Sequence, residues 1–306
     1  MIYTLTLNPA LDYLVTLPQL LPGSTNRTTF EEVQWGGKGI NVSRLLKNLK
    51  IESVAMGFLA GFTGQALKQG LQSQGLNTNF IEVEGGLTRI NIKVKALEET
   101  EINGSGPSIS TQSIEALMEK MDLIGDGDLL VMAGNVPASI DDDIYGRIME
   151  CLKNRSILCA VDTSGQALAK ALPYRPFVIK PNLKELNALC GSEAKTDLEI
   201  VAQAKNLQAQ GAQNVMVSMA GQGALFLSSD GQVWKATVPD GEVQNSAGAG
   251  DSMIAGFLAG HLWGCPLEQT FRLAAAAGTA TAFSTTLATL TEITALVERT
   301  VVSLWP

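Results

Sequence analysis

Two patterns of apolar residues alternate along the middle of the chain. Apolar positions three and four residues apart indicate helices, and short continuous apolar runs indicate buried strands. Helices that alternate with strands in this way are typical of a parallel sheet with helices on both faces. We therefore expect an α/β, doubly wound, mostly parallel sheet, with helices over 111–122, 140–152 and 165–171 and strands over 128–133, 157–162 and 177–180.

The first part of the chain contains similar elements in a less regular order. An apolar run over 2–8 predicts a strand that ends in a turn. The apolar residues that follow Gly39 have the spacing of an amphipathic helix. We expect strands over 52–59 and 78–83, with a helix over about 63–74 between them.

A strictly alternating segment begins at residue 89. Ile90, Ile92 and Val94 would point to one side of a strand, and basic and polar residues would point to the other. Taken alone, the segment is compatible with a half-buried hairpin that has a solvated polar face. We expect instead a small sheet that covers a cleft, with these lid strands lying within about 12–35 and 88–104.

The last third of the chain is mainly helical. A strand over 213–218 and a hairpin formed by 224–227 and 232–236 precede expected helices over 249–263, 267–283 and 291–303. No repeat, low-complexity linker or change of composition marks a second full domain. We therefore expect residues 1–306 to form a single domain.

Composition and charge narrow the classes of partner. The formal net charge of −8 argues against a nucleic-acid or anionic-membrane partner. An anionic substrate would need a local basic patch, and Arg89, Lys93 and Lys95 on one face of the lid strand could supply it. The four cysteines form no C-x-x-C pair and the N-terminus resembles a strand rather than a signal peptide, so we expect a cytoplasmic protein with reduced thiols.

The most informative chemistry lies in the segment Asn245–Asp251. Its glycines, Gly248 and Gly250, predict a turn that leads directly into a helix, with Ala249 between them. The free N–H groups and positive dipole end of a helix N-terminus attract phosphate. A phosphate bound there would repel the carboxylate of Asp251, so this position indicates a chemical role, such as accepting the proton of an attacking hydroxyl. The alternative is an ordinary acidic residue in the first turn of a helix.

A second glycine turn at a helix start spans Gly36 to Asn41. It is not a Walker A loop, because Gly39 rather than Ser or Thr follows Lys38. Gly37 would let a ligand approach the backbone, while Lys38 and Asn41 would reach that ligand. The alternative is a plain turn with a solvated lysine.

Several polar residues follow the predicted strands, where ligands bind to parallel sheets. Asp12 could accept hydrogen bonds from two sugar hydroxyls or be a surface turn residue. Asn182 and Glu185 have the spacing of a capping box, but they could also face Mg²⁺ and its waters. Asn135 lies in another such turn.

These motifs, in this order, resemble the ribokinase family in its phosphofructokinase-B branch. The matching segments span nearly the whole chain: Asn8–Asp12, Gly36–Asn41, Lys180–Glu185, Ser218–Gly223 and Asn245–Asp251. The chain departs from many members at Asn245-Ser246, where Asp-Thr is common, and at Asn135, where related kinases often have serine.

The resemblance implies a ribokinase-like fold and a set of site residues. It implies that Asp251 is the catalytic base and that Gly248, Ala249 and Gly250 form an anion hole. It implies a sugar site, a nucleotide site and a Mg²⁺ site. The sugar site would contain Asp12, Gly37, Lys38, Asn41 and Asn135; the nucleotide site Lys180, Asn182, Ser218, Ala220, Gly221, Gly223, Gly248 and Gly250; the metal site Glu185 and Asn182.

Within the branch, the segments Thr88–Lys93 and Thr100–Asn103 look most like the 1-phosphofructokinases, and tagatose-6-phosphate kinases are the next most similar group. The implied reaction converts fructose 1-phosphate and ATP to fructose 1,6-bisphosphate and ADP, with Arg89 and Lys93 at the sugar phosphate. A catalytically silent sugar-phosphate or nucleotide sensor is the alternative from another class. A dehydrogenase is excluded, because no G-x-G-x-x-G follows the first strand. We also expect a homodimer formed through the lid, with Arg27 near the neighbour's site.

Overall fold

A sheet of eleven strands forms the middle layer of the molecule. The computed structural model describes residues 1–305. Eight of the strands pair with one another in parallel. Three antiparallel strands extend it at one edge. The strand order is β15 (Val302–Leu304), β14 (Val233–Ala236), β13 (Ala224–Leu227), β12 (Asn214–Ser218), β11 (Val178–Ile179), β10 (Leu158–Asp162), β9 (Leu129–Ala133), β1 (Ile2–Thr6), β4 (Ser53–Ala60) and β5 (Asn77–Thr78), and β6 (Ile81–Val83) also pairs with β4.

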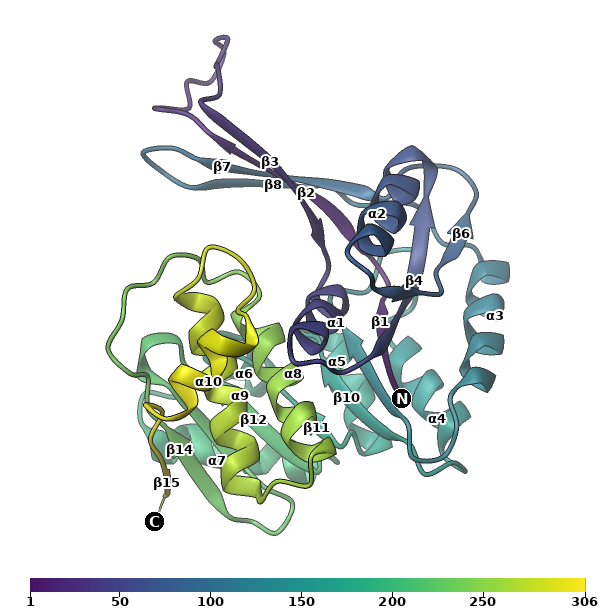
Figure 1. Cartoon of the computed structure of the whole chain (residues 1–306). Helices are drawn as coiled ribbons and strands as arrows, with labels where there is room; N and C mark the ends of the chain where they lie inside the picture. The colour runs from purple at the N-terminus through teal and green to yellow at the C-terminus, as the bar shows by residue number, and fades with distance from the viewer. Residues whose placement is uncertain (306) are drawn as a thin grey trace.

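Helices cover both faces of this sheet (Figure 1). Alternate residues of each central strand enter different cores: Leu5 of β1 belongs to one and Ile2 to the other. One face carries α3 (Thr111–Lys120), α4 (Ile144–Leu152), α5 (Gly165–Ala171), α6 (Leu183–Cys190) and α7 (Asp197–Ala209), and the other carries α1 (Lys38–Asn48), α2 (Gly61–Ser73), α8 (Ala249–Leu262), α9 (Leu267–Ala282) and α10 (Leu290–Val297). The expected doubly wound, ribokinase-like α/β fold is confirmed.

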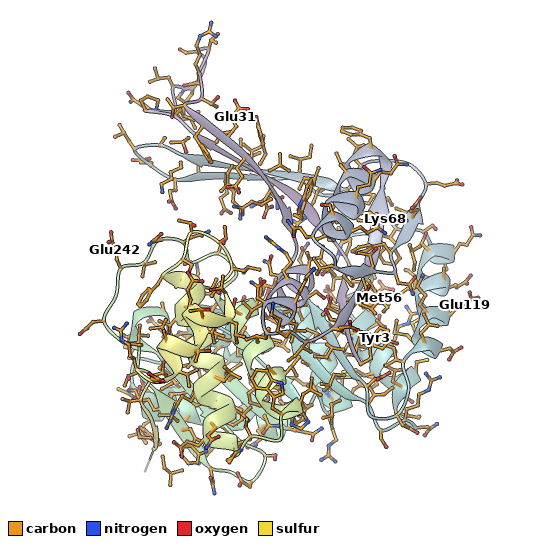
Figure 2. The ribbon with its side chains drawn as sticks, viewed as in Figure 1. Tyr3, Glu31, Met56, Lys68, Glu119 and Glu242 are labelled. Carbon is orange, nitrogen blue, oxygen red and sulfur yellow. The ribbon has the colours of Figure 1, made fainter. Side chains whose placement is uncertain are left out.

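Four further strands form a separate sheet, which we call the lid. It projects from the body in Figure 1, and Figure 2 shows Glu31 on it, far from Tyr3 and Met56 in the body. Its strand order is β3 (Phe30–Gly36), β2 (Ala10–Thr16), β7 (Arg89–Lys95) and β8 (Thr100–Asn103). These strands lie within residues 10–36 and 89–103, and the sheet that they form stands out from the body (Figure 1).

The register of the lid separates its two faces. Ile90, Ile92 and Val94 lie opposite Leu11, Tyr13 and Val15 of β2, so these residues share the apolar face. Asn91 and Lys93 lie opposite Asp12 and Leu14, so they share the polar face. The alternation expected from the sequence is therefore present.

Three expectations about secondary structure were wrong or incomplete. The last helix ends at Val297 rather than 303, because Val302–Leu304 pairs with β14 as an edge strand, β15. The strand expected over 78–83 is two short strands, β5 and β6. Helix α7, which begins with a capping box formed by Thr196 and Glu199, was not predicted. In residues 1–305, no helix is long and apolar enough to cross a membrane.

Candidate active site

The N-terminus of α8 holds the proposed base. Gly248 has φ of +79°, a conformation that glycine adopts without strain, and the helix begins at Ala249. Asp251, two residues later, is only 6% exposed. Its Oδ2 accepts a hydrogen bond of 2.8 Å from the Nδ2 of Asn41 on α1. The fold therefore brings together two residues that lie 210 positions apart in the sequence.

The electrostatic environment of Asp251 suits a base. Burial, followed by the negative charge of Asp162, raises the pKa of Asp251 to about 6, although Lys38, the Asn41 hydrogen bond and Lys180 act in the opposite direction. A pKa near 6 leaves the carboxylate ionised at neutral pH but basic enough to accept a proton.

Two lysines meet at a carboxylate that the sequence analysis did not single out. Asp162, at the carboxyl end of β10, is 1% exposed. Its oxygens lie 3.2 Å from the Nζ of Lys38 and 3.5 Å from the Nζ of Lys180. Burial alone would raise the pKa of Asp162, but the two lysine charges outweigh burial and lower it.

The cluster of Asp162, Lys38 and Lys180 lies next to the glycine turn before α8. A Cβ at Gly250 would lie 2.7 Å from the Nζ of Lys180, so the lysine ammonium lies against the backbone at the start of α8. Lys180 is itself buried, with 4% of its surface exposed. The helix N-terminus and the ammonium therefore present positive charge to the same place, which suits a phosphoryl group in transfer.

Asn182 and Glu185 make the capping box at the start of α6. Asn182 Oδ1 accepts from the Glu185 N–H, and Glu185 Oε2 accepts from the Asn182 N–H, both at 2.8 Å. The other oxygen of Glu185 lies 4.0 Å from Lys38 Nζ. In residues 1–305, no three Asp, Glu, His or Cys side chains cluster as a metal site. A Mg²⁺ site here would consist of the Glu185 oxygen that takes no part in the capping box, with phosphate and water oxygens.

The expected nucleotide turn follows β12 on the adjacent strand. Ser218 forms a β-bridge with Asn182, which places the two motifs side by side. Ala220 has φ of +49° and begins a short 3₁₀ turn that includes Gly221. A Cβ at Gly223 would lie 2.0 Å from the carbonyl oxygen of Ala236, so only glycine fits there.

The polar face of the lid carries the other predicted residues. Asp12 accepts from Asn91 Nδ2 at 2.8 Å and lies 3.3 Å from Lys93 Nζ. Arg89 uses its Nε to donate to the carbonyl oxygen of Asn8, and within residues 1–305 its terminal nitrogens make no hydrogen bond. Burial lowers the pKa of Arg89, and Asp12 partly offsets this effect.

Two predicted sugar-site residues differ in how closely the fold holds them. Gly37, with φ of +135°, packs against Thr6 and precedes α1. Asn135 is exposed, and its side chain makes no hydrogen bond within the described residues. A Cβ at the preceding Gly134 would lie 3.9 Å from Lys38, so Asn135 borders the site without being held in it.

Asp162 is the site residue that the sequence analysis missed. One signal was available: a carboxylate at the end of a strand, adjacent in the sheet to the strand that ends before Lys180. The pairing of β10 with β11 is not visible in the sequence. The contact between Asp162 and Lys180 could therefore not be predicted without knowing the order of the strands in the sheet.

Comparison with known proteins identifies the class. Residues 6–293 match the model of the pfkB family carbohydrate kinases. The chain therefore belongs to this family, whose members transfer a phosphoryl group to a carbohydrate. The buried Asp251 at the glycine turn and the adjacent lysines agree with such chemistry.

Particular relatives refine this assignment. A 1-phosphofructokinase of Bacillus subtilis (strain 168) is 47% identical over 289 residues, which cover 94% of this chain and 95% of the relative. A D-tagatose-1-phosphate kinase of Bacillus licheniformis is 39% identical, covering 93% of each chain. A crystal structure of a putative phosphofructokinase from Staphylococcus aureus has a TM-score of 0.88 at 38% identity, and the match covers 100% of this chain and 99% of that one.

Proposed function

We propose that this protein transfers the γ-phosphoryl group of ATP to the 6-hydroxyl of fructose 1-phosphate, giving fructose 1,6-bisphosphate and ADP. The observation that carries the proposal is the position of Asp251. It is buried at a helix N-terminus, held by Asn41, and adjoins a lysine that faces the same glycine turn. The 47% identity to a 1-phosphofructokinase over 94% of the chain supports this substrate.

Asp251 acts as the general base in the proposed mechanism. With a pKa of about 6 it is mostly ionised at neutral pH, and it accepts the proton of the attacking hydroxyl. The transition state of phosphoryl transfer is loose, so the proton moves late and a stronger base is unnecessary. The hydrogen bond from Asn41 fixes the direction of the carboxylate.

The charge of the moving phosphoryl group is balanced by residues of the body. The N–H groups of Gly248, Ala249 and Gly250 and the ammonium groups of Lys180 and Lys38 provide positive charge there. Mg²⁺ bound by Glu185 and the phosphate oxygens, with Asn182 beside it, would supply further charge neutralisation. The Ser218–Gly223 turn, which contains Ala220 and Gly221, lies beside Asn182 and would hold the nucleotide.

The lid and its junction with the body bind the sugar phosphate in this proposal. Asp12 and Asn41 are positioned to accept and donate hydrogen bonds to sugar hydroxyls, near Gly37 and Asn135. Arg89 has free terminal nitrogens, which can contact phosphate in a bidentate manner, while Lys93 adds a point charge.

A substrate panel tests the proposal. Release of ADP should be measured with fructose 1-phosphate, tagatose 1-phosphate, tagatose 6-phosphate and unphosphorylated fructose. We expect fructose 1-phosphate to give the highest kcat/KM and fructose to give little turnover. Preference for tagatose 6-phosphate would favour the alternative kinase assignment, and binding of a sugar phosphate or ATP without turnover would indicate a sensor.

We also propose a cytoplasmic homodimer in which two lids pack together through their apolar faces. Val33, Ile90 and Ile102 on this face are 40–57% exposed in the single chain, and the open edges of the sheet leave backbone groups free to pair with another chain. Arg27, exposed in the loop between β2 and β3, would then lie near the neighbour's site. All four cysteines are free thiols, which suits the cytoplasm. Light scattering at micromolar concentration should give the dimer mass, and a monomer would refute this assembly.

A further inference from the structure

A cavity of about 100 Å³ lies where the lid meets the body. Asp12 and Lys93 reach it from the lid, Asn41 and Arg44 from α1, and Asn245 from the segment before α8. Asn41 also holds Asp251, so the cavity adjoins the proposed base. Arg89 is not among the residues that line it.

Arg44 differs from the other cations near the base. Lys38 and Lys180 are paired with Asp162, and Lys93 is paired with Asp12. Within residues 1–305, Arg44 has no hydrogen bond and no ion pair within 4 Å, although it is partly buried. Burial lowers the pKa of its guanidinium, and the negative charge of Glu32 only partly offsets this effect. A partly desolvated guanidinium without a partner favours an anion.

The position of Arg44 on α1 suits the far end of the sugar. Arg44 follows Asn41 by three residues, so the two side chains emerge on the same face of the helix. The helical rise places Arg44 about 4.5 Å further from the helix start. In a ketohexose phosphate, the phosphate lies at the opposite end of the carbon chain from the attacking hydroxyl. With that hydroxyl at Asp251, the phosphate extends past Asn41 toward Arg44.

We propose that Arg44 is a further cation at the phosphate of the sugar substrate. It binds this phosphate from the body side, while Lys93 within the cavity and Arg89 beyond its lining face the same phosphate from the lid. The inference rests on the proposed kinase function and adds a substrate-specificity residue to it. The planar guanidinium can donate two parallel hydrogen bonds to phosphate oxygens, which an ammonium cannot do. Glu32, on β3, attracts the guanidinium of Arg44 and would repel an incoming phosphate. The phosphate must therefore compete with Glu32 for Arg44.

The test is steady-state kinetics of Arg44→Ala, Arg44→Gln and Arg44→Lys with fructose 1-phosphate and ATP. Arg147→Ala removes an exposed arginine on α4 and is the matched control. We expect Arg44→Ala and Arg44→Gln to raise the KM for fructose 1-phosphate by about tenfold to a hundredfold, the scale for losing a charged hydrogen-bond partner. The KM for ATP should change by less than threefold or so, and Arg44→Lys should recover part of the loss.

The outcomes separate this inference from the proposed function. An active wild-type enzyme whose KM for fructose 1-phosphate is unchanged in Arg44→Ala overturns the role of Arg44 and leaves the kinase function intact. Equal increases in both KM values, with no recovery in Arg44→Lys, indicate a structural role and also overturn it. A wild-type protein that turns over no phosphorylated ketohexose overturns both proposals.

Discussion

The body and the lid hold their charges in different ways. In the body, Lys38 and Lys180 share the carboxylate of Asp162 behind the glycine turn, and Asp251 is fixed by Asn41. On the lid, the polar face carries Arg89 and Lys93. The apolar face is covered only in part, because Val33, Ile90 and Ile102 remain 40–57% exposed. The body therefore fixes its charged groups through contacts within the chain, whereas part of the lid remains exposed in the single chain.

This difference predicts that variants in the body and variants on the lid will affect different kinetic constants. Changes in the body should lower kcat because they alter groups that act in the transition state. Changes on the lid should raise the KM for the sugar phosphate because they remove contacts made in the ground state as well. The following predictions test this division, beginning with the largest expected effect.

Replacement of the proposed base should have the largest effect. Asp251→Ala should lower kcat by about 10²–10⁴, the scale for loss of general-base catalysis. The affinities for ATP and sugar phosphate should change little, as measured by steady-state kinetics and titration calorimetry. Asp240→Ala, an exposed carboxylate before α8, serves as the control. A variant that keeps a tenth of the wild-type kcat would exclude Asp251 as the base.

The matching lid variant is Arg89→Ala. It should weaken binding of fructose 1-phosphate by about 2–4 kcal/mol, because a charged partner of the phosphate is lost. Kinetics should show a nearly constant KM for ATP, and Lys93→Ala should have a smaller effect of the same kind. Lys205→Ala, which removes an exposed cation on α7 far from the lid strand in the sequence, is the control. An unchanged KM for the sugar phosphate would remove the lid strand from the phosphate site.

Asp162 is expected to act as a positioning residue in the body. Asp162→Asn keeps the shape but leaves Lys38 and Lys180 without their counter-charge, so kcat should fall by about tenfold to a hundredfold. The charges and polar groups that face Asp251 come from Asp162 on β10, from Lys38 and Asn41 on α1, and from Lys180 after β11.

The pH profile separates this role from a loss of folding. Because the charge of Asp162 raises the pKa of Asp251, the acidic limb of the kcat profile should move from near pH 6 to lower pH in Asp162→Asn. A fall in kcat and melting temperature with an unshifted acidic limb would mean that Asp162 is only structural.

The smallest expected effect concerns stability. The pKa of Asp251 is raised in the folded state, so folding favours its protonated form. Below about pH 4 the carboxyl is protonated in both the folded and the unfolded state, so the raised pKa has no effect on stability. As pH rises from about 4 through about 6, ionisation favours the unfolded state and the free energy of unfolding falls. Asp251→Asn should stabilise the protein at pH 7.5 by roughly 1–3 kcal/mol, and the difference should disappear near pH 4. Thermal melts over this pH range provide the measurement, with exposed Asp142→Asn as the control. A variant less stable than wild type at pH 7.5 would contradict the raised pKa.

The sequence predicted those features that depend on local pattern. The glycine turn before Asp251, the helix after Lys38 and the alternation over the lid strand are all encoded in neighbouring residues. Asn182 and Glu185 show a limit, because one spacing fits both a cap and a metal site, and the cap contacts became visible only in three dimensions. Asp162 shows another limit, because its role depends on ion pairs with lysines that come from two other parts of the chain.

The end of the chain illustrates a third limit. Apolar residues continue past Val297 at spacings that fit a helix, but Val302 is buried by pairing with β14. Pairing with a distant edge strand overrides a local preference in a short segment. The pattern that gives the right helix at 290–297 therefore extends it too far.

The most direct test of the account is ³¹P NMR of ATP and fructose 1-phosphate incubated with the wild-type protein and with Asp251→Ala. The account predicts that the wild type converts both reactants in equal amounts to ADP and fructose 1,6-bisphosphate, while the variant forms these products at least about a hundredfold more slowly. Formation of ADP and inorganic phosphate alone, or equal product formation by both proteins, would contradict transfer to the sugar phosphate with Asp251 as the base.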